Sequence, residues 1–239
     1  MKTIGIIGGL SPESTILYYQ GINDGVRARL GGHHNGRVLL NSLDFGEFVK
    51  LKEKGDWATQ SRLLCDAAKS LEKAGADFII LATNTMHKMA DDIESSIHAP
   101  FLHLADATAE TIESQAIQCV ALLGTRYTME LDFYKGRLEA KGIKVLVPNE
   151  VGIKDVHDII YDELCNGIVR DESRAKYVDI INELEQQGAQ GVILGCTEIG
   201  MLIKPDDVDC VVFDTTEIHI EKSLEYMFDE EEVCAAISA

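Results

Sequence analysis

The chain has 239 residues, of which 40 are acidic and 22 basic, so its formal net charge is −18 at pH 7. Hydrophobic residues make up 46% and charged residues 26%, a globular balance that excludes disordered and fibrous classes. At roughly 150 residues per domain, this length corresponds to one large domain or two small ones. A surface with this much negative charge repels phosphate backbones and anionic lipid. We therefore expect neither nucleic acid nor a membrane as partner.

The N-terminus and the cysteines indicate a cytoplasmic protein. The apolar run at residues 3–7 is short, contains glycine and is followed by no cleavage-site pattern, so we interpret it as a buried strand. The six cysteines include no C-x-x-C pair and no tight cluster with histidine, which argues against disulfides and structural zinc. We therefore expect a reduced protein without a metal. Buried structural roles are expected for Cys65, Cys119, Cys165, Cys210 and Cys234.

Short apolar runs alternate with amphipathic stretches along the chain. The runs predict strands at residues 3–7, 37–42, 78–82, 119–123, 144–147, 191–194 and 211–213. The amphipathic stretches predict helices near residues 12–30, 56–74, 85–95, 127–141, 151–165, 171–187 and 215–228. Continuously apolar strands that alternate with helices are typical of parallel sheets covered on both faces, so the predicted fold class is α/β. The acidic stretch 229–232 is interpreted as a solvated tail.

An internal repeat divides the chain into two similar halves. Residues 71–83 align with residues 184–196, and six of the 13 aligned pairs are identical, among them Gly75/Gly188. We expect two pseudo-symmetric, flavodoxin-like domains at residues 1–105 and 106–214, with a C-terminal helix at 215–239 that joins the first. Because open α/β sheets bind ligands at the carboxyl ends of their strands, such halves would place two strand ends across one cleft.

The repeat aligns Thr83 with Cys196. Each residue follows a buried strand and precedes a predicted helix, whose free amides can bind a carboxylate and favour the thiolate form of Cys196. Thr85 and Thr197 add hydroxyl groups beside them. Two proton-handling groups across a cleft suit a reaction that removes a proton from a carbon stereocentre and returns one to the opposite face.

Three segments in order carry a family resemblance: I-G-I-I-G-G-L-S-P-E-S-T at residues 4–15, T-N-T-M-H at 83–87 and G-C-T-E at 195–198. Together they resemble the PLP-independent aspartate/glutamate racemase family, and most closely its broad-specificity branch, some of whose members have threonine in the first motif. The resemblance spans essentially the whole chain. It implies two α/β domains with the active site between them, a small amino-acid substrate, no cofactor and a homodimer. The family usually has C-N-T and G-C-T motifs, whose cysteines act on opposite faces of Cα.

The resemblance also implies roles for individual residues. Cys196 would be the base and acid on one face of Cα, and Thr83 the proton donor and acceptor on the other. Because a hydroxyl is far less acidic than a thiol, we expect racemisation that is efficient from one enantiomer and slow from the other. Substrate contacts are expected from Leu10, Ser11, Lys52, Lys54, Asn84, Thr85 and Thr197. Supporting positions near the site are expected for His87, Glu198 and His219.

Lys52 and Lys54 are selected because an acidic substrate has a distal carboxylate, which needs a positively charged partner. In archaeal-type aspartate racemases, an arginine in the loop after the second strand and a lysine in the second half hold the substrate carboxylates. Here the loop expected at residues 44–57 has lysines but no arginine, and residues 161–167 include no lysine. Solvated loop charges are the alternative interpretation of these lysines.

Two other functions remain open at this stage. A related decarboxylase or isomerase needs only one cysteine, which protonates a carbanion. A two-lobed amino-acid-binding protein would have a similar cleft, but such proteins are typically exported. The glycines after the first strand do not have the G-x-G-x-x-G spacing of a dinucleotide site, and His33 and His34 have no third metal ligand at a useful spacing.

Overall fold

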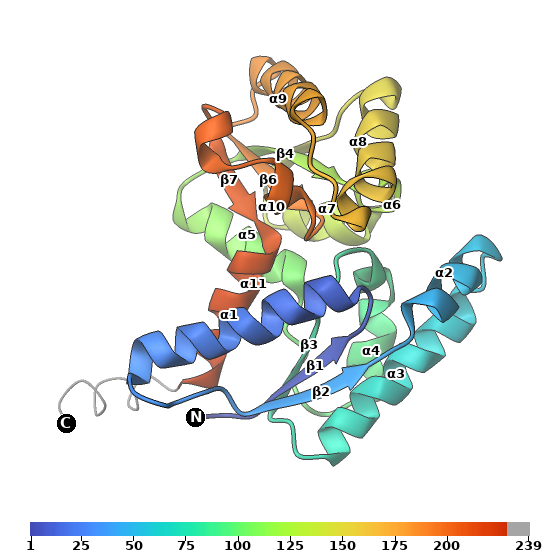
Figure 1. Cartoon of the computed structure of the whole chain (residues 1–239), viewed down its shortest axis with the longest axis vertical. Coiled ribbons are helices and arrows are strands. Elements are labelled where there is room, and N and C mark those ends of the chain that lie inside the picture. Colours follow the sequence, from blue (N-terminus) through green and yellow to red (C-terminus); the bar gives the residue numbers. More distant parts are fainter. Residues whose placement is uncertain (229–239) are drawn as a thin grey trace. The chain divides into compact units, whose positions relative to one another are not determined.

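The computed structural model describes residues 1–228 and divides into two compact units (Figure 1). Unit 1 comprises Met1–Leu104 together with the segment that begins at His219, and unit 2 comprises Ala105–Ile218. Each unit contains one parallel sheet with helices, which confirms the predicted α/β class, and all seven predicted strands are present. Cys234, the tail at 229–232 and the end of the helix predicted at 215–239 lie outside the described residues.

The sheet of unit 1 has the order β2-β1-β3, with all strands parallel. Its elements are β1 (Ile4–Gly8), α1 (Pro12–Leu30), β2 (Val38–Ser42), α2 (Phe45–Glu53), α3 (Trp57–Lys73), β3 (Phe78–Leu81), the 3₁₀ helix η1 (Thr85–Met89), α4 (Ala90–Ser96) and the later part of α11 (Thr215–Met227). Successive strand residues face opposite sides of a sheet. Thus Ile6 and Ile80 pack with α1 and α11, whereas Ile79 and Leu81 pack with α3 and α4.

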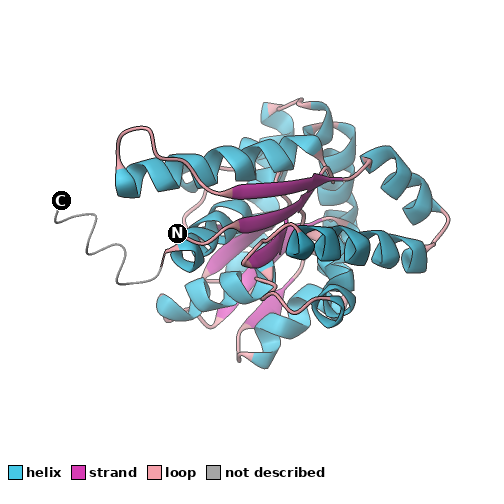
Figure 2. Ribbon diagram, turned by 90° about the horizontal axis from the view of Figure 1, so that it is seen from below, coloured by secondary structure: helices cyan, strands magenta, loops and turns pink. Residues whose placement is uncertain are grey.

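The sheet of unit 2 repeats this order and adds one strand, giving β5-β4-β6-β7, again all parallel (Figure 2). Its elements are α5 (Leu104–Ser114), β4 (Cys119–Gly124), α6 (Arg126–Glu130), α7 (Asp132–Ala140), β5 (Lys144–Leu146), α8 (Glu150–Asp162), η2 (Leu164–Asn166), α9 (Asp171–Gln186), β6 (Gly191–Gly195), α10 (Ile199–Leu202), η3 (Pro205–Asp207), β7 (Val211–Asp214) and the start of α11. The main apolar cluster of unit 2 lies between this sheet and α8 and α9.

The identical pair Gly75/Gly188 has a structural reason. Gly75 follows α3 with φ +97°, and Gly188 follows α9 with φ +105°. In both units the chain leaves a helix through this left-handed turn and enters the next strand, β3 or β6, three residues after the glycine. A residue with a Cβ is strained in that region, so both turns need glycine.

Two sequence-based expectations are wrong, and helix α5 was not expected. Residues 45–53 form helix α2 rather than a loop, because the Asp44 side chain caps it, accepting a hydrogen bond from the Gly46 amide at 2.9 Å. Helix α5 was not predicted; it begins at Leu104, next to the domain boundary expected at residue 105. Cys165 is exposed on η2, although a buried structural role was predicted for it.

Candidate active site

The Thr83 segment begins where β3 ends, at the carboxyl edge of the unit 1 sheet. The Thr83 amide donates to the Leu81 carbonyl at 2.9 Å, and η1 starts two residues later. Thr83 is partly buried, while Asn84 and Thr85 are buried. Within residues 1–228 the Thr83 hydroxyl makes no hydrogen bond to protein. Its oxygen is therefore available to a ligand.

His87 fixes the backbone of this segment. Its Nε2 accepts a hydrogen bond from the Leu104 amide at 3.3 Å, and its Nδ1 lies 2.7 Å from the Thr83 carbonyl oxygen. Because an amide can only donate and a carbonyl can only accept, the proton must be on Nδ1, which donates to Thr83. The neutral His87 ring thus links the Thr83 carbonyl to the Leu104 amide within unit 1.

Two further buried histidines pack beside His87. The ring centroids of His87 and His103 are 4.5 Å apart, and those of His87 and His219 are 6.1 Å apart. His219 Nε2 donates to the Leu102 carbonyl at 3.0 Å, which leaves Nδ1 to accept from the Tyr18 hydroxyl at 2.8 Å. Burial lowers the pKa of His219 to about 4, so this ring is neutral near pH 7. His219 is therefore a structural bridge between α11 and α1.

The Leu10–Ser11 turn lies at the same edge of the unit 1 sheet as Thr83, because β1 and β3 are parallel and Ile7 pairs with Leu81. The Ser11 side chain caps α1 by accepting from the Ser14 amide at 3.3 Å. Leu10 and Ser11 are both buried. The structure therefore brings these two predicted residues to the strand edge that carries Thr83.

Lys52 and Lys54 are positioned by α2. Lys52 is partly buried in the last turn of this helix, and Lys54 is its exposed C-cap residue. Lys52 therefore lies in a helix rather than in the expected loop, whereas Lys54 lies in the short turn that follows the helix. Their spacing is set by the helix, so they point in directions about 200° apart around its axis.

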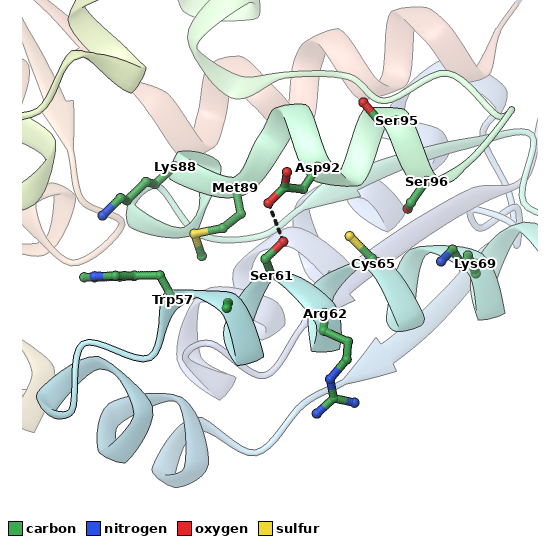
Figure 3. A pocket seen from close by; sticks show the side chains of 11 residues that line it. Trp57, Ser61, Arg62, Cys65, Lys69, Lys88, Met89, Asp92, Ser95 and Ser96 are labelled. Carbon is green, nitrogen blue, oxygen red and sulfur yellow. Dashed lines mark hydrogen bonds between the residues drawn. The ribbon is translucent and has the colours of Figure 1, made fainter.

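A groove of about 750 Å³ runs between α3 and the η1–α4 segment of unit 1 (Figure 3). The Lys88 ammonium lies 3.7 Å from the centre of the Trp57 ring at one end. Farther along, the Ser61 hydroxyl donates to Asp92 and joins the two helices. None of the residues expected to contact substrate lines this groove.

The Cys196 segment occupies the corresponding strand end in unit 2. Cys196 directly follows β6 and is partly buried, and its Sγ donates to Glu198 Oε2 at 2.9 Å. The Thr197 hydroxyl donates to the same oxygen at 2.7 Å. One carboxylate oxygen thus holds two of the side chains that the sequence analysis selected.

The pKa of the Cys196 thiol is shifted in the direction opposite to the expected one. Burial raises the pKa of Cys196 well above its ordinary value, and the charge of Glu198 and its hydrogen bond raise it further. Helix α10, which follows, has only four residues, so its dipole does not reverse this effect. The prediction that the helix N-terminus favours a thiolate is therefore wrong, and Cys196 rests as a thiol.

Tyr161 is a neighbour of Cys196 that the sequence analysis did not select. Both side chains pack against the apolar cluster of unit 2, and burial raises the pKa of Tyr161, with a smaller contribution from the charge that Cys196 has when ionised. The charge of Cys165 also raises the pKa of Cys196. Tyr161 lies on α8, which is an amphipathic helix. Its spacing along this helix is that of an ordinary core residue, so the sequence alone does not single it out.

Among residues 1–228, no group of three or more histidine, cysteine, aspartate or glutamate side chains is arranged to hold a metal ion. The helices in that part of the chain are all too short or too polar to cross a membrane. The two strand ends described above present a hydroxyl in one unit and a carboxylate-bound thiol in the other.

Two similar parallel-sheet units, one with a hydroxyl and the other with a thiol at an equivalent strand end, define a two-unit α/β protein. Residues 7–223 match the model of the Asp/Glu/Hydantoin racemase family. A solved structure from Yersinia pestis, named as a candidate Asp/Glu racemase, has 51% identity and a TM-score of 0.92, covering 96% of this chain and 100% of its own. An aspartate racemase homologue from Pyrococcus horikoshii OT3 has 39% identity and a TM-score of 0.85, with coverage of 95% and 99%.

A curated relative, the broad specificity amino-acid racemase RacX of Bacillus subtilis (strain 168), is 24% identical over 220 residues, which are 89% of this chain and 92% of RacX. The chain belongs to the Asp/Glu/Hydantoin racemase family. This confirms the resemblance found in the sequence. The protein is an enzyme, an amino-acid racemase.

Proposed function

We propose that this enzyme racemises aspartate, glutamate or both by direct proton transfer at Cα, without PLP, as a cytoplasmic homodimer. The observation that carries the proposal is the pair of equivalent strand ends after β3 and β6, one with Thr83 and the other with Cys196. The names of the relatives support the reaction class and acidic amino acids as substrates.

Cys196 transfers the proton on one face of Cα. Because the thiol rests protonated, it must lose its proton before it can act as a base, and Glu198 Oε2 at 2.9 Å is the acceptor within reach. In the opposite direction the thiol donates its proton to the carbanion directly. Glu198 therefore positions the thiol and takes up its proton.

Thr83 serves the other face of Cα. Its hydroxyl is a weak acid and a weaker base than a thiolate, but it can donate or relay a proton. Asn84, Thr85 and Thr197 hold the α-carboxylate, and the Leu10–Ser11 turn shapes the substrate site on the unit 1 side. Lys52 and Lys54 are the cations proposed for the distal carboxylate. The different proton affinities of the two groups make the reaction faster from one enantiomer than from the other.

The test is proton NMR of each enantiomer of aspartate and glutamate in D2O with the PLP-free protein. We expect loss of the Cα–H signal at unequal rates for the two enantiomers. Cys196→Ser should abolish exchange of the enantiomer that Cys196 deprotonates, whereas Thr83→Cys should make the two rates more equal. Unchanged exchange in Cys196→Ser would refute the assignment. Release of CO2 from malonates without Cα exchange would instead identify a decarboxylase.

A further inference from the structure

Gln60 is a fully buried polar residue in the first turn of α3. Its side chain is 0% exposed, and its Nε2 donates to the Phe48 carbonyl of α2 at 2.7 Å. Its Oε1 has no hydrogen-bond partner within residues 1–228. A buried acceptor without a partner costs free energy that offsets much of the gain from the other hydrogen bond. Stability alone thus gives little reason for an amide at this position.

Helix α2, which Gln60 contacts, is joined to the rest of unit 1 mainly around Phe48 (Figure 1). Among the nine residues of α2, Phe48 alone is buried, and it belongs to an apolar cluster that also contains Leu10 and Met86. Leu10 precedes Ser11, and Met86 follows Thr85. The inner side of α2 therefore shares a core with both unit 1 segments that are proposed to bind substrate.

The start of α2 is fixed beside the Leu10–Ser11 turn. The Leu43 amide donates to the Gly8 carbonyl at 2.9 Å, and a Cβ on Gly9 would lie 2.2 Å from the Leu43 carbonyl oxygen. Gly9 has φ +82°, so glycine permits both this turn and the close approach of the two segments. The Asp44 cap then begins the helix. The position of the last turn of α2 depends on contacts farther along, and the bond to Gln60 is one of them.

Lys52 lies one helical turn beyond the residue that Gln60 holds. Residues four apart share one side of a helix, so the Lys52 side chain leaves α2 on the side of Phe48, where it is partly buried. In an α-helix the carbonyl of residue 48 is also the acceptor for the amide of residue 52, about 6 Å farther along the axis. The Gln60 hydrogen bond therefore acts on the turn that carries Lys52. Lys50 points to the opposite side of α2 and is exposed.

We propose that Gln60 is a positioning residue for substrate binding: by holding the Phe48 carbonyl it sets the direction of α2, and it thereby places the Lys52 ammonium to bind the distal carboxylate of an acidic amino acid. Gln60 is buried, so it acts through α2 without touching the substrate. This role rests on the proposed function, in which Lys52 is a cation for the distal carboxylate. It adds the contact on which the place of that cation depends.

The test is isothermal titration calorimetry of the full chain with racemic aspartate, whose composition the reaction does not change. Gln60→Met keeps the length of the side chain but removes the donor. We expect its dissociation constant to rise by about five- to tenfold, while the urea midpoint of unfolding stays close to that of the wild type. Lys52→Met should weaken binding by about tenfold or more, because it removes the charge itself. The matched control is Lys50→Met on the same helix, which should bind like the wild type.

A double variant tests whether Gln60 acts through Lys52. If it does, Gln60→Met combined with Lys52→Met should bind aspartate no more weakly than Lys52→Met alone. Additive losses would place the effect of Gln60 elsewhere and overturn the proposal. Unchanged binding in either single variant, or a wild type that does not bind aspartate, would overturn it as well.

Cα–H exchange in D2O, measured on the same proteins, separates this proposal from the proposed reaction. A wild type that binds aspartate but does not exchange its Cα–H refutes the reaction, and the binding constants of the variants still decide the role of Gln60. A wild type that exchanges, together with a Gln60→Met variant of unchanged affinity, refutes the role of Gln60 and leaves the reaction in place.

Discussion

His87 offers the sharpest test of how the Thr83 segment is held. Its ring makes two hydrogen bonds in opposite senses, donating from Nδ1 to the Thr83 carbonyl and accepting at Nε2 from the Leu104 amide. Asparagine places an amide group near the position of Nδ1, and glutamine places one near the position of Nε2. His87→Asn therefore keeps the contact with Thr83, and His87→Gln keeps the contact with Leu104.

The two variants should differ in activity more than in stability. Each leaves one buried backbone group without its partner, which costs about 1–3 kcal/mol of unfolding free energy. Only His87→Gln releases the Thr83 carbonyl, and a displacement of about 1 Å at a reacting group lowers rates by about 100-fold. We therefore expect a decrease of about 10- to 100-fold for His87→Gln, confined to the exchange direction that depends on Thr83.

The assay is Cα–H exchange in D2O for each enantiomer, measured beside urea unfolding of the same variants. In His87→Asn the exchange rates of both enantiomers should stay within about threefold of the wild type. In His87→Gln the exchange of the enantiomer that faces Thr83 should slow, and the exchange of the enantiomer that faces Cys196 should be unchanged. Equal losses in both variants and in both directions would mean that His87 contributes to folding alone. A wild type without any exchange would refute the proposed reaction rather than the role of His87.

Further predictions concern the thiol, a buried histidine and a close backbone contact. Glu198→Gln removes a charge that raises the pKa of Cys196, so the pH dependence of iodoacetamide alkylation should shift to lower pH; an unchanged profile would exclude this influence. Because the pKa of His219 is lowered from 6.5 to about 4, only the unfolded chain gains this proton between those values. The unfolding free energy should fall by about 3 kcal/mol from pH 6.5 to pH 4, and this part of the dependence should be missing in His219→Gln. Gly200→Ala would place a Cβ 2.5 Å from a carboxylate oxygen on β7 and should lower the melting temperature, whereas Gly136→Ala on α7 meets nothing closer than 3.9 Å and should not.

The α/β fold could be predicted from the order of apolar runs and amphipathic stretches, because both sheets are buried on their two faces. Strands such as β3 and β6 then read as continuous apolar runs, and the glycine after each preceding helix marks where the chain turns. Helix α2 was missed since its start depends on one capping side chain, Asp44, and its single buried residue, Phe48, gives no apolar stripe.

The contacts inside the candidate site were less accessible to sequence reasoning. The thiolate form of Cys196 was predicted from the helix dipole alone. The sequence does not show how deeply the thiol is buried, and burial is the largest cause of its raised pKa. The contact of His87 with Leu104 joins residues 17 positions apart, and no periodic pattern connects them. Spacing identifies which residues follow a strand, whereas solvation and hydrogen-bond direction depend on the packing of the whole unit.

The two strand ends are held in different ways, and the difference bears on the expected asymmetry of the reaction. At Thr83 the structure holds the backbone through the neutral His87 ring and leaves the hydroxyl without a protein partner within residues 1–228. At Cys196 it holds the side chain itself, through a carboxylate that accepts the hydrogen bond of the thiol. A threonine needs no deprotonated resting state to act as a donor, so a fixed position is sufficient for it. A thiol with a raised pKa must lose a proton to act as a base, so it needs an acceptor beside it. Proton removal by Cys196 should therefore depend on Glu198, and proton transfer at the Thr83 face, in either direction, should depend on the position that His87 gives to Thr83.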